Sequence, residues 1–167
     1  MGHLDHREAS PTSVRCFVLT VSDTRTEATD TGGAAVVELL ESAGHHVSGR
    51  RLVRDEPADV RSAVEAQLST DGVDAIITTG GTGIGARDGT VEIVDALLQK
   101  RLPGFGELFR MLSFEEIGAA AMLSRACAGM AHGRIVVALP GSEHAVRLAM
   151  TRLVLPELGH LVREATR

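Results

Sequence analysis

Three segments of the chain are almost continuously apolar, and each is short enough to be a single strand. They cover residues 14–21, 73–79 and 134–139. Such a run is typical of a strand whose two faces are both buried in a parallel sheet. A fourth segment, residues 47–53, contains more polar residues and predicts a weaker strand nearer to a sheet edge.

Segments with helical periodicity lie between these strands. From Thr31 onward, apolar residues recur at positions i, i+3, i+4 and i+7, and Gly44 is placed to end the helix. A second helix is predicted to open at Pro57, where a missing amide costs little, and a third to cover residues 91–98. A further helix is predicted to begin at Glu143.

Two parts of the pattern are less regular. Residues 103–129 are predicted to be mostly helical, with interruptions at Gly104, Gly106 and Gly118, and are expected to wrap around a pocket or a subunit contact. Pro156 predicts a break before a short last helix.

Strands that alternate with helices of this length predict an α/β fold, a three-layer sandwich with a mainly parallel sheet. Ligands of such sheets bind at the carboxyl ends of the strands. Three of the predicted strands end in polar or glycine-containing loops, which begin with Ser22-Asp23, with Gly80 and with Pro140-Gly141-Ser142. We expect these loops to meet at one edge of the sheet.

Composition narrows the choice of partners. The 167 residues carry a formal net charge of −5, with the Lys and Arg residues scattered, and only 2% of the residues are aromatic. This disfavours nucleic acid as a partner, because neither a basic face nor a stacking platform is indicated. A phosphate ligand would have to be bound by the groups of one small site and not by an extended basic surface. We expect one domain over residues 14–167, preceded by a flexible N-terminal tail over residues 1–13.

The sequence also bears on the location of the protein. No segment approaches the roughly twenty apolar residues of a membrane span, and the first residues lack the apolar core of a signal peptide. Cys16 and Cys127 are far apart, which excludes a zinc ribbon and argues against a disulfide framework. We expect a cytoplasmic protein.

The sequence TTGGTGIGARDGT, residues 78–90, joins a predicted strand to a predicted helix. Backbone amides at such a turn attract phosphate, so Gly80, Gly81, Thr82 and Gly83 are candidates to bind a phosphate or pyrophosphate. A tight turn with no ligand is the alternative. The GK[ST] of a P-loop is missing, and the match to GxGxxA lacks the acidic residue that would bind a ribose.

Acidic residues near this loop suggest a cation. Asp88 follows the glycines and Asp55 precedes Pro57, so either residue could instead cap a helix. Because Mg²⁺ is usually held by one or two carboxylates plus phosphate oxygens, Asp55 and Asp88 together are a candidate magnesium site. Arg87 either offsets the charge of a transferring phosphate or braces Asp88.

The neighbouring loops add further candidates for phosphate binding. Ser22 and Asp23 follow the first strand, and Gly141 and Ser142 follow the last one. Ser142 also has the position of a helix N-cap, which is the favoured interpretation for this residue.

Taken together, these motifs resemble the MoaB/MogA family of molybdenum cofactor biosynthesis proteins, and most of all its MoaB members. The resemblance runs from about Arg15 to the C-terminus. It rests on five stretches: LTVSDTR (19–25), TTGGTGIGARDGT (78–90), PGFGELFRMLSFEEIG (103–118), LSRACAG (123–129) and LPGSEHAVRLAM (139–150).

The resemblance implies a molybdopterin-binding domain that assembles as a homotrimer, or in some members as a homohexamer. In active members the terminal phosphate of molybdopterin attacks the α-phosphate of Mg-ATP, which gives adenylyl-molybdopterin and pyrophosphate. The substrates would thus be ATP and molybdopterin, with Mg²⁺ as the cofactor. Other molybdenum cofactor biosynthesis enzymes are possible partners.

The resemblance also implies roles for individual residues. Asp55 and Asp88 match the family's catalytic acids, whereas Ser113, Ser124 and Arg125 match positions of the molybdopterin-binding region. A non-catalytic member that binds or scaffolds molybdopterin is the alternative function, and an unrelated nucleotide-binding regulator is a third.

Overall fold

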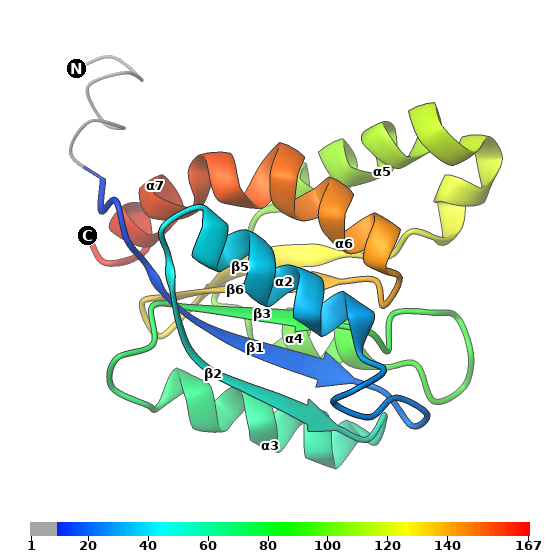
Figure 1. The fold of residues 1–167 in the computed structure, drawn as a ribbon, viewed down its shortest axis with the longest axis horizontal. Helices are drawn as coiled ribbons and strands as arrows, with labels where there is room; N and C mark the ends of the chain where they lie inside the picture. The colour runs from blue at the N-terminus through cyan, green and yellow to red at the C-terminus, as the bar shows by residue number, and fades with distance from the viewer. Residues whose placement is uncertain (1–9) are drawn as a thin grey trace.

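The computed structural model describes residues 10–167 (Figure 1). Residues 1–9 of the expected tail lie outside the described residues. In the described part of that segment, Pro11 packs closely against Gly159. A Cβ atom at residue 159 would lie 2.3 Å from the carbonyl oxygen of Pro11. No helix among residues 10–167 is long and apolar enough to cross a membrane.

The described strands form one six-stranded mixed sheet in the order β2-β1-β3-β6-β5-β4. Four strands, β2, β1, β3 and β6, are parallel, whereas β5 is antiparallel to β6 and β4 is antiparallel to β5. The more polar strand, β2, lies at an edge, as predicted. The strands are β1 (Arg15–Val21), β2 (His46–Val53), β3 (Ala75–Thr79), β4 (Lys100–Arg101), β5 (Cys127–Ala131) and β6 (Arg134–Leu139).

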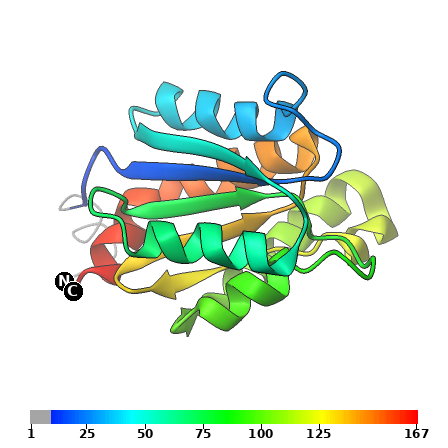
Figure 2. The same cartoon turned by 90° about the horizontal axis from the view of Figure 1, so that it is seen from below.

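Helices cover both faces of the sheet, which confirms the three-layer α/β architecture (Figures 1 and 2). One face carries α2 (Thr31–Ser42), α5 (Pro103–Ile117), α6 (Glu143–Ala149) and α7 (Leu155–Ala165). The other face carries α3 (Pro57–Leu68) and α4 (Thr90–Leu97). Each face has its own apolar core, and the side chains of β1 alternate between them: Val18 packs with the first group of helices and Leu19 with the second. Burial on both faces explains why this strand is a continuous apolar run.

One strand, β5, corrects the prediction for residues 103–129. This segment is helical through α5 and a 3₁₀ helix (Gly118–Leu123), but Cys127–Ala131 forms β5. His132 and Gly133, both with positive φ, form the two-residue turn from β5 to β6, the geometry of a tight hairpin. The sequence CAGMA has little strand propensity, so pairing with β6 decides its conformation.

The predicted break at Pro156 is also corrected. The chain passes from α6 to α7 through a π-helical turn, Met150–Val154, without leaving a helical path. Pro156 lies in the first turn of α7, where the missing amide has no helical partner to lose. The proline thus marks a change of hydrogen-bonding pattern and not an interruption.

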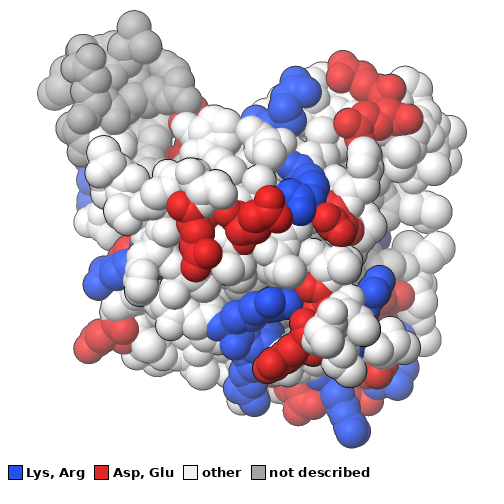
Figure 3. All heavy atoms as spheres, viewed as in Figure 1, with Lys and Arg blue, Asp and Glu red and all other residues white. Residues whose placement is uncertain are grey.

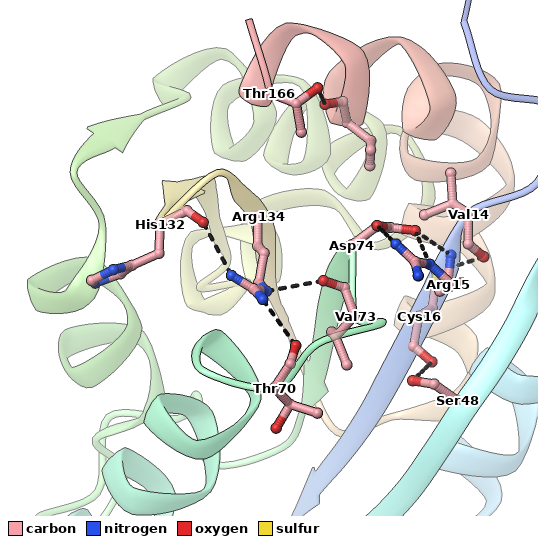
Figure 4. A network of polar contacts seen from close by, with 11 residues as sticks. Val14, Arg15, Cys16, Ser48, Thr70, Val73, Asp74, His132, Arg134 and Thr166 are labelled. Atoms are coloured by element: carbon pink, nitrogen blue, oxygen red, sulfur yellow. Dashed lines mark hydrogen bonds and ion pairs between the residues drawn. The ribbon is translucent and has the colours of Figure 1, made fainter.

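The amino ends of the strands are joined by two arginines (Figure 4). Arg15 makes a bidentate contact with Asp74, with Nε–Oδ2 and Nη2–Oδ1 distances of 2.9 and 2.7 Å. Arg134 donates to the carbonyl oxygens of Val73 and Thr70, both at 2.9 Å, and of His132 at 3.2 Å. The polar groups at this end of the sheet are therefore engaged with one another, whereas the opposite end carries the candidate loops.

Candidate functional site

The loops at the carboxyl ends of the strands surround a cavity of about 440 Å³. The structure brings together ten of the residues singled out from the sequence, which line this cavity: Ser22, Asp23, Asp55, Gly80, Gly81, Thr82, Gly83, Asp88, Gly141 and Ser142. Convergence of these loops at one edge is thus observed, as expected for parallel strands. Thr20, Arg25, Asp30 and Thr79 also line the cavity and were not singled out.

The conformation of the glycine loop requires glycine at two positions. Gly80 and Gly81 have φ values of +94° and +66°. A Cβ atom at Gly80 would lie 2.2 Å from the carbonyl oxygen of Val21, and one at Gly81 would lie 2.3 Å from Thr90 Oγ1. The backbone is held from both sides, because the Gly80 amide donates to the Leu139 carbonyl and the Thr90 amide to the Gly81 carbonyl, both at 3.0 Å.

The amides at the tip of this loop are free to bind an anion. Within residues 10–167, nothing accepts a hydrogen bond from the backbone amides of Gly81, Thr82 or Gly83. All three residues line the cavity. Consecutive unpaired amides around a concave loop are suited to phosphate oxygens.

The two candidate acids do not cap helices. Helix α4 has Gly89 as its N-cap and α3 has Glu56, in both cases without a side-chain hydrogen bond. Asp88 instead accepts a hydrogen bond from the Gly85 amide at 2.8 Å, so it braces the glycine loop. The capping interpretation is therefore wrong for both Asp55 and Asp88.

Asp55 and Asp88 form an acidic pair beside the loop. Burial raises the pKa of the Asp55 carboxyl, and the charges of Asp88 and Asp23 raise it further against a smaller opposing effect of Arg87. Among the described residues no group of three or more His, Cys, Asp or Glu side chains could hold a metal ion. Two neighbouring carboxylates are the protein ligands that Mg²⁺ usually takes alongside water and phosphate oxygens.

Arg87 braces the neighbouring loops and not Asp88. Its Nη2 atom lies 3.3 Å from Asp23 Oδ2 and 2.5 Å from Glu56 Oε1, and it donates to the Asp55 carbonyl at 3.3 Å. The Asp55 amide donates to Asp23 Oδ1 at 3.2 Å. Asp23 and Arg87 thus hold the main chain of Asp55 from its two sides and leave its carboxylate to face the cavity.

Asp30 is the most deeply buried acid at the edge of the cavity, with 4% exposure. It caps α2 by accepting from the Gly33 amide at 2.9 Å, and it accepts from Thr20 Oγ1 at 2.6 Å and Arg50 Nη2 at 2.8 Å. Burial alone would raise the pKa of Asp30, but these hydrogen bonds outweigh it and lower the pKa. The sequence signal was an Asp directly before a helix start.

A second cavity, of about 280 Å³, adjoins the first at Ser142. Ser113 and Ser124 line it together with apolar side chains of α5, α6 and the 3₁₀ helix. The hydroxyl of Ser142 accepts from the Ala145 amide at 3.2 Å, which confirms this residue as the N-cap of α6. Arg125 lines neither cavity and forms an ion pair with Glu92.

The charged side chains on one face of the molecule are mixed in sign. On the face seen in Figure 3, Lys and Arg side chains lie among Asp and Glu side chains, so the described residues visible there present no continuous basic surface.

Comparison with known proteins gives the family. The model of a probable molybdopterin binding domain matches residues 17–160. Molybdenum cofactor biosynthesis protein B of Halalkalibacterium halodurans is 51% identical over 160 residues, which cover 95% of this chain and 94% of the relative. The chain belongs to the MoaB family of molybdenum cofactor biosynthesis proteins. The Bacillus subtilis member of the MoaB family is 48% identical, with 98% of this chain and 97% of the relative covered.

Solved structures of the MoaB family share the fold. A crystal structure of molybdenum cofactor biosynthesis protein B superposes with a TM-score of 0.90 at 51% identity, covering 93% of this chain and 98% of the other. The tungsten cofactor synthesizing protein MoaB of Pyrococcus furiosus gives a TM-score of 0.84 at 36% identity, covering 95% of this chain and all of the other. The predicted α/β fold with a mainly parallel sheet is confirmed.

Proposed function

We propose that this chain binds molybdopterin and transfers the adenylyl group of Mg-ATP to it. A terminal phosphate oxygen of molybdopterin attacks the α-phosphorus of ATP, the bond to the β-phosphate breaks, and pyrophosphate leaves. The observation that carries this proposal is the juxtaposition, in one cavity, of three unpaired amides with an acidic pair. A transfer between two bound phosphates needs positioning and charge neutralisation and no protein nucleophile.

Each group has a distinct role in this reaction. The amides of Gly81, Thr82 and Gly83 hold phosphate oxygens of the nucleotide. Asp55 and Asp88 would hold Mg²⁺, which offsets the negative charge of the phosphates when it is bound. Asp55 is suited to this role because burial, and then the negative charges of Asp88 and Asp23, raise its pKa, and a bound cation would offset that repulsion.

The second cavity is the proposed site of the pterin. Ser113 and Ser124 offer hydroxyl groups, and the apolar wall formed by Ile117, Leu123 and Leu148 suits a flat ring system. Ser142 lies at the border between the cavities, so a ligand that spans both would place its phosphate near the glycine loop. Arg125 would reach the pterin only by leaving Glu92.

One assay tests the proposal against its alternatives. Purified protein incubated with molybdopterin, ATP and Mg²⁺ is expected to yield adenylyl-molybdopterin and pyrophosphate in equal amounts, detected by chromatography. Molybdopterin binding without product would instead establish a binding or scaffolding function. Affinity for nucleotide without affinity for molybdopterin would indicate a nucleotide-binding regulator.

We further propose that the chain forms a homo-oligomer, a trimer or hexamer, through the outer side of α5. Leu108, Met111, Phe114 and Ile117 recur every three residues along this helix and are 47–62% exposed. Met122 and Leu123 of the adjoining 3₁₀ helix are 80% and 59% exposed. So many exposed large apolar side chains along one segment favour an interaction surface there.

A charge placed on this surface is expected to separate the subunits. Phe114→Glu should convert the oligomer to a monomer, because a carboxylate would have to be desolvated in the contact. Multi-angle light scattering measures the mass. Ala58→Glu, at an exposed position of α3 on the other face of the sheet, is the matched control and should leave the mass unchanged. A Phe114→Glu protein of unchanged mass would exclude this surface as the contact.

A further inference from the structure

Two buried side-chain oxygen atoms among the described residues have no hydrogen-bond partner, Thr78 Oγ1 and Thr90 Oγ1. Both side chains are fully buried, with 0% exposure. An unpaired buried hydroxyl is unfavourable, because it has lost its bonds to water and gained none in return. Valine has nearly the same shape without this cost, so it matters whether either threonine lies beside a group that its hydroxyl could bind in another state of the protein.

Thr90 borders the acidic pair. A Cβ atom at Gly81 would lie 2.3 Å from Thr90 Oγ1 and 3.1 Å from Asp55 Oδ1, so both oxygen atoms face the same small space beside Gly81. That space exists only because residue 81 is glycine. Neither threonine lines the cavity itself, and Thr78 lies within β3, away from Gly81 and Asp55.

The two groups are complementary. Thr90 has a hydroxyl proton without an acceptor among the described residues. The Asp55 carboxylate is an acceptor whose side-chain hydrogen-bonding neighbour, Asp88, is another acid. Thr90 does not serve α4 as a cap, because the N-cap is Gly89 and no side chain is hydrogen-bonded there. The Thr90 amide is already bound to the Gly81 carbonyl at 3.0 Å, which holds the hydroxyl beside the loop.

We propose that Thr90 is a positioning residue whose hydroxyl donates a hydrogen bond to the Asp55 carboxylate when nucleotide occupies the loop. This bond would engage one carboxylate oxygen and leave the other available to hold Mg²⁺. The role rests on the proposed function, since it matters only if Asp55 takes part in binding Mg-ATP. Glycine at position 81 leaves open the space that both oxygen atoms border, since a Cβ atom there would lie 2.3 Å from Thr90 Oγ1 and 3.1 Å from Asp55 Oδ1.

Removal of the hydroxyl tests this role by separating stability from binding. Thr90→Val is expected to unfold at the same temperature as the wild type or higher, because no bond is lost in the free protein. Its affinity for Mg-ATP, measured by isothermal titration calorimetry without molybdopterin, is expected to fall about tenfold, the effect of losing one hydrogen bond to a charged group. Thr90→Ser keeps the hydroxyl and should restore the affinity.

Thr78→Val is the matched control, since it removes the other unpaired hydroxyl. It should also keep or raise the unfolding temperature, with an unchanged affinity for Mg-ATP. Wild-type affinity in Thr90→Val, or a clear loss of its stability, would overturn the proposal, as would a wild type that does not bind Mg-ATP. A wild type that binds Mg-ATP without forming adenylyl-molybdopterin would refute the proposed reaction alone, because the calorimetric comparison of Thr90 variants would stand.

Discussion

Asp88→Asn is expected to lower the rate of adenylyl-molybdopterin formation by at least about a hundredfold, the usual effect of removing one group that stabilises transition-state charge. Asparagine has the same shape as aspartate and retains an oxygen that can accept from the Gly85 amide, as Asp88 does at 2.8 Å. The loop should therefore keep its conformation while the acidic pair loses half of its charge. Product formation under saturating ATP measures the effect.

Two comparisons make this result specific. Asp55→Asn should have an effect of similar size, and the double variant should lose little more, because two ligands of one cation act as a unit. Asp71→Asn, an exposed position in the turn before β3, makes the same change in net charge at the other end of the sheet and should be neutral. Unchanged turnover in a folded Asp88→Asn protein would exclude Asp88 from the reaction.

The sequence predicts the central strands well because their environment is uniform. Residues of β1, β3 and β6 are buried on both faces, so apolar content alone identifies them. In contrast, β4 has two exposed residues and β5 has the sequence CAGMA, and neither shows a strand pattern. Their conformation depends on hydrogen bonds to β6 and to each other, which no local pattern reveals.

For the site, the sequence predicts which loops meet but not which side chains bond to each other. Parallel strands bring their carboxyl ends together, and this places the three loops around one cavity. The side-chain contacts are decided between loops that are distant in the sequence. Arg87 contacts Asp23 and Glu56, and Asp55 does not cap α3. For the same reason Ser113 and Ser124 share a cavity whereas the adjacent Arg125 turns to Glu92.

Asp30→Ala is expected to lower the free energy of unfolding by about 3 kcal/mol, within the range for breaking a buried ion pair. The change removes the N-cap of α2 and leaves Thr20 and Arg50 without the carboxylate that now lies 2.6 and 2.8 Å from them. Urea unfolding at pH 7 measures the loss. Asp74→Ala, which breaks a pair whose arginine is 53% exposed, should cost about 1 kcal/mol or less.

The pH dependence identifies the cause of this loss. Because the pKa of Asp30 is lower in the folded than in the unfolded chain, its carboxylate stabilises the fold at neutral pH. This contribution is lost as the pH falls below about 4, the ordinary value for aspartate, toward the folded pKa. The difference in stability between wild type and Asp30→Ala should therefore shrink in acid. If the difference in the free energy of unfolding stayed constant with pH, packing around α2, and not the charge of the Asp30 carboxylate, would account for the lost stability.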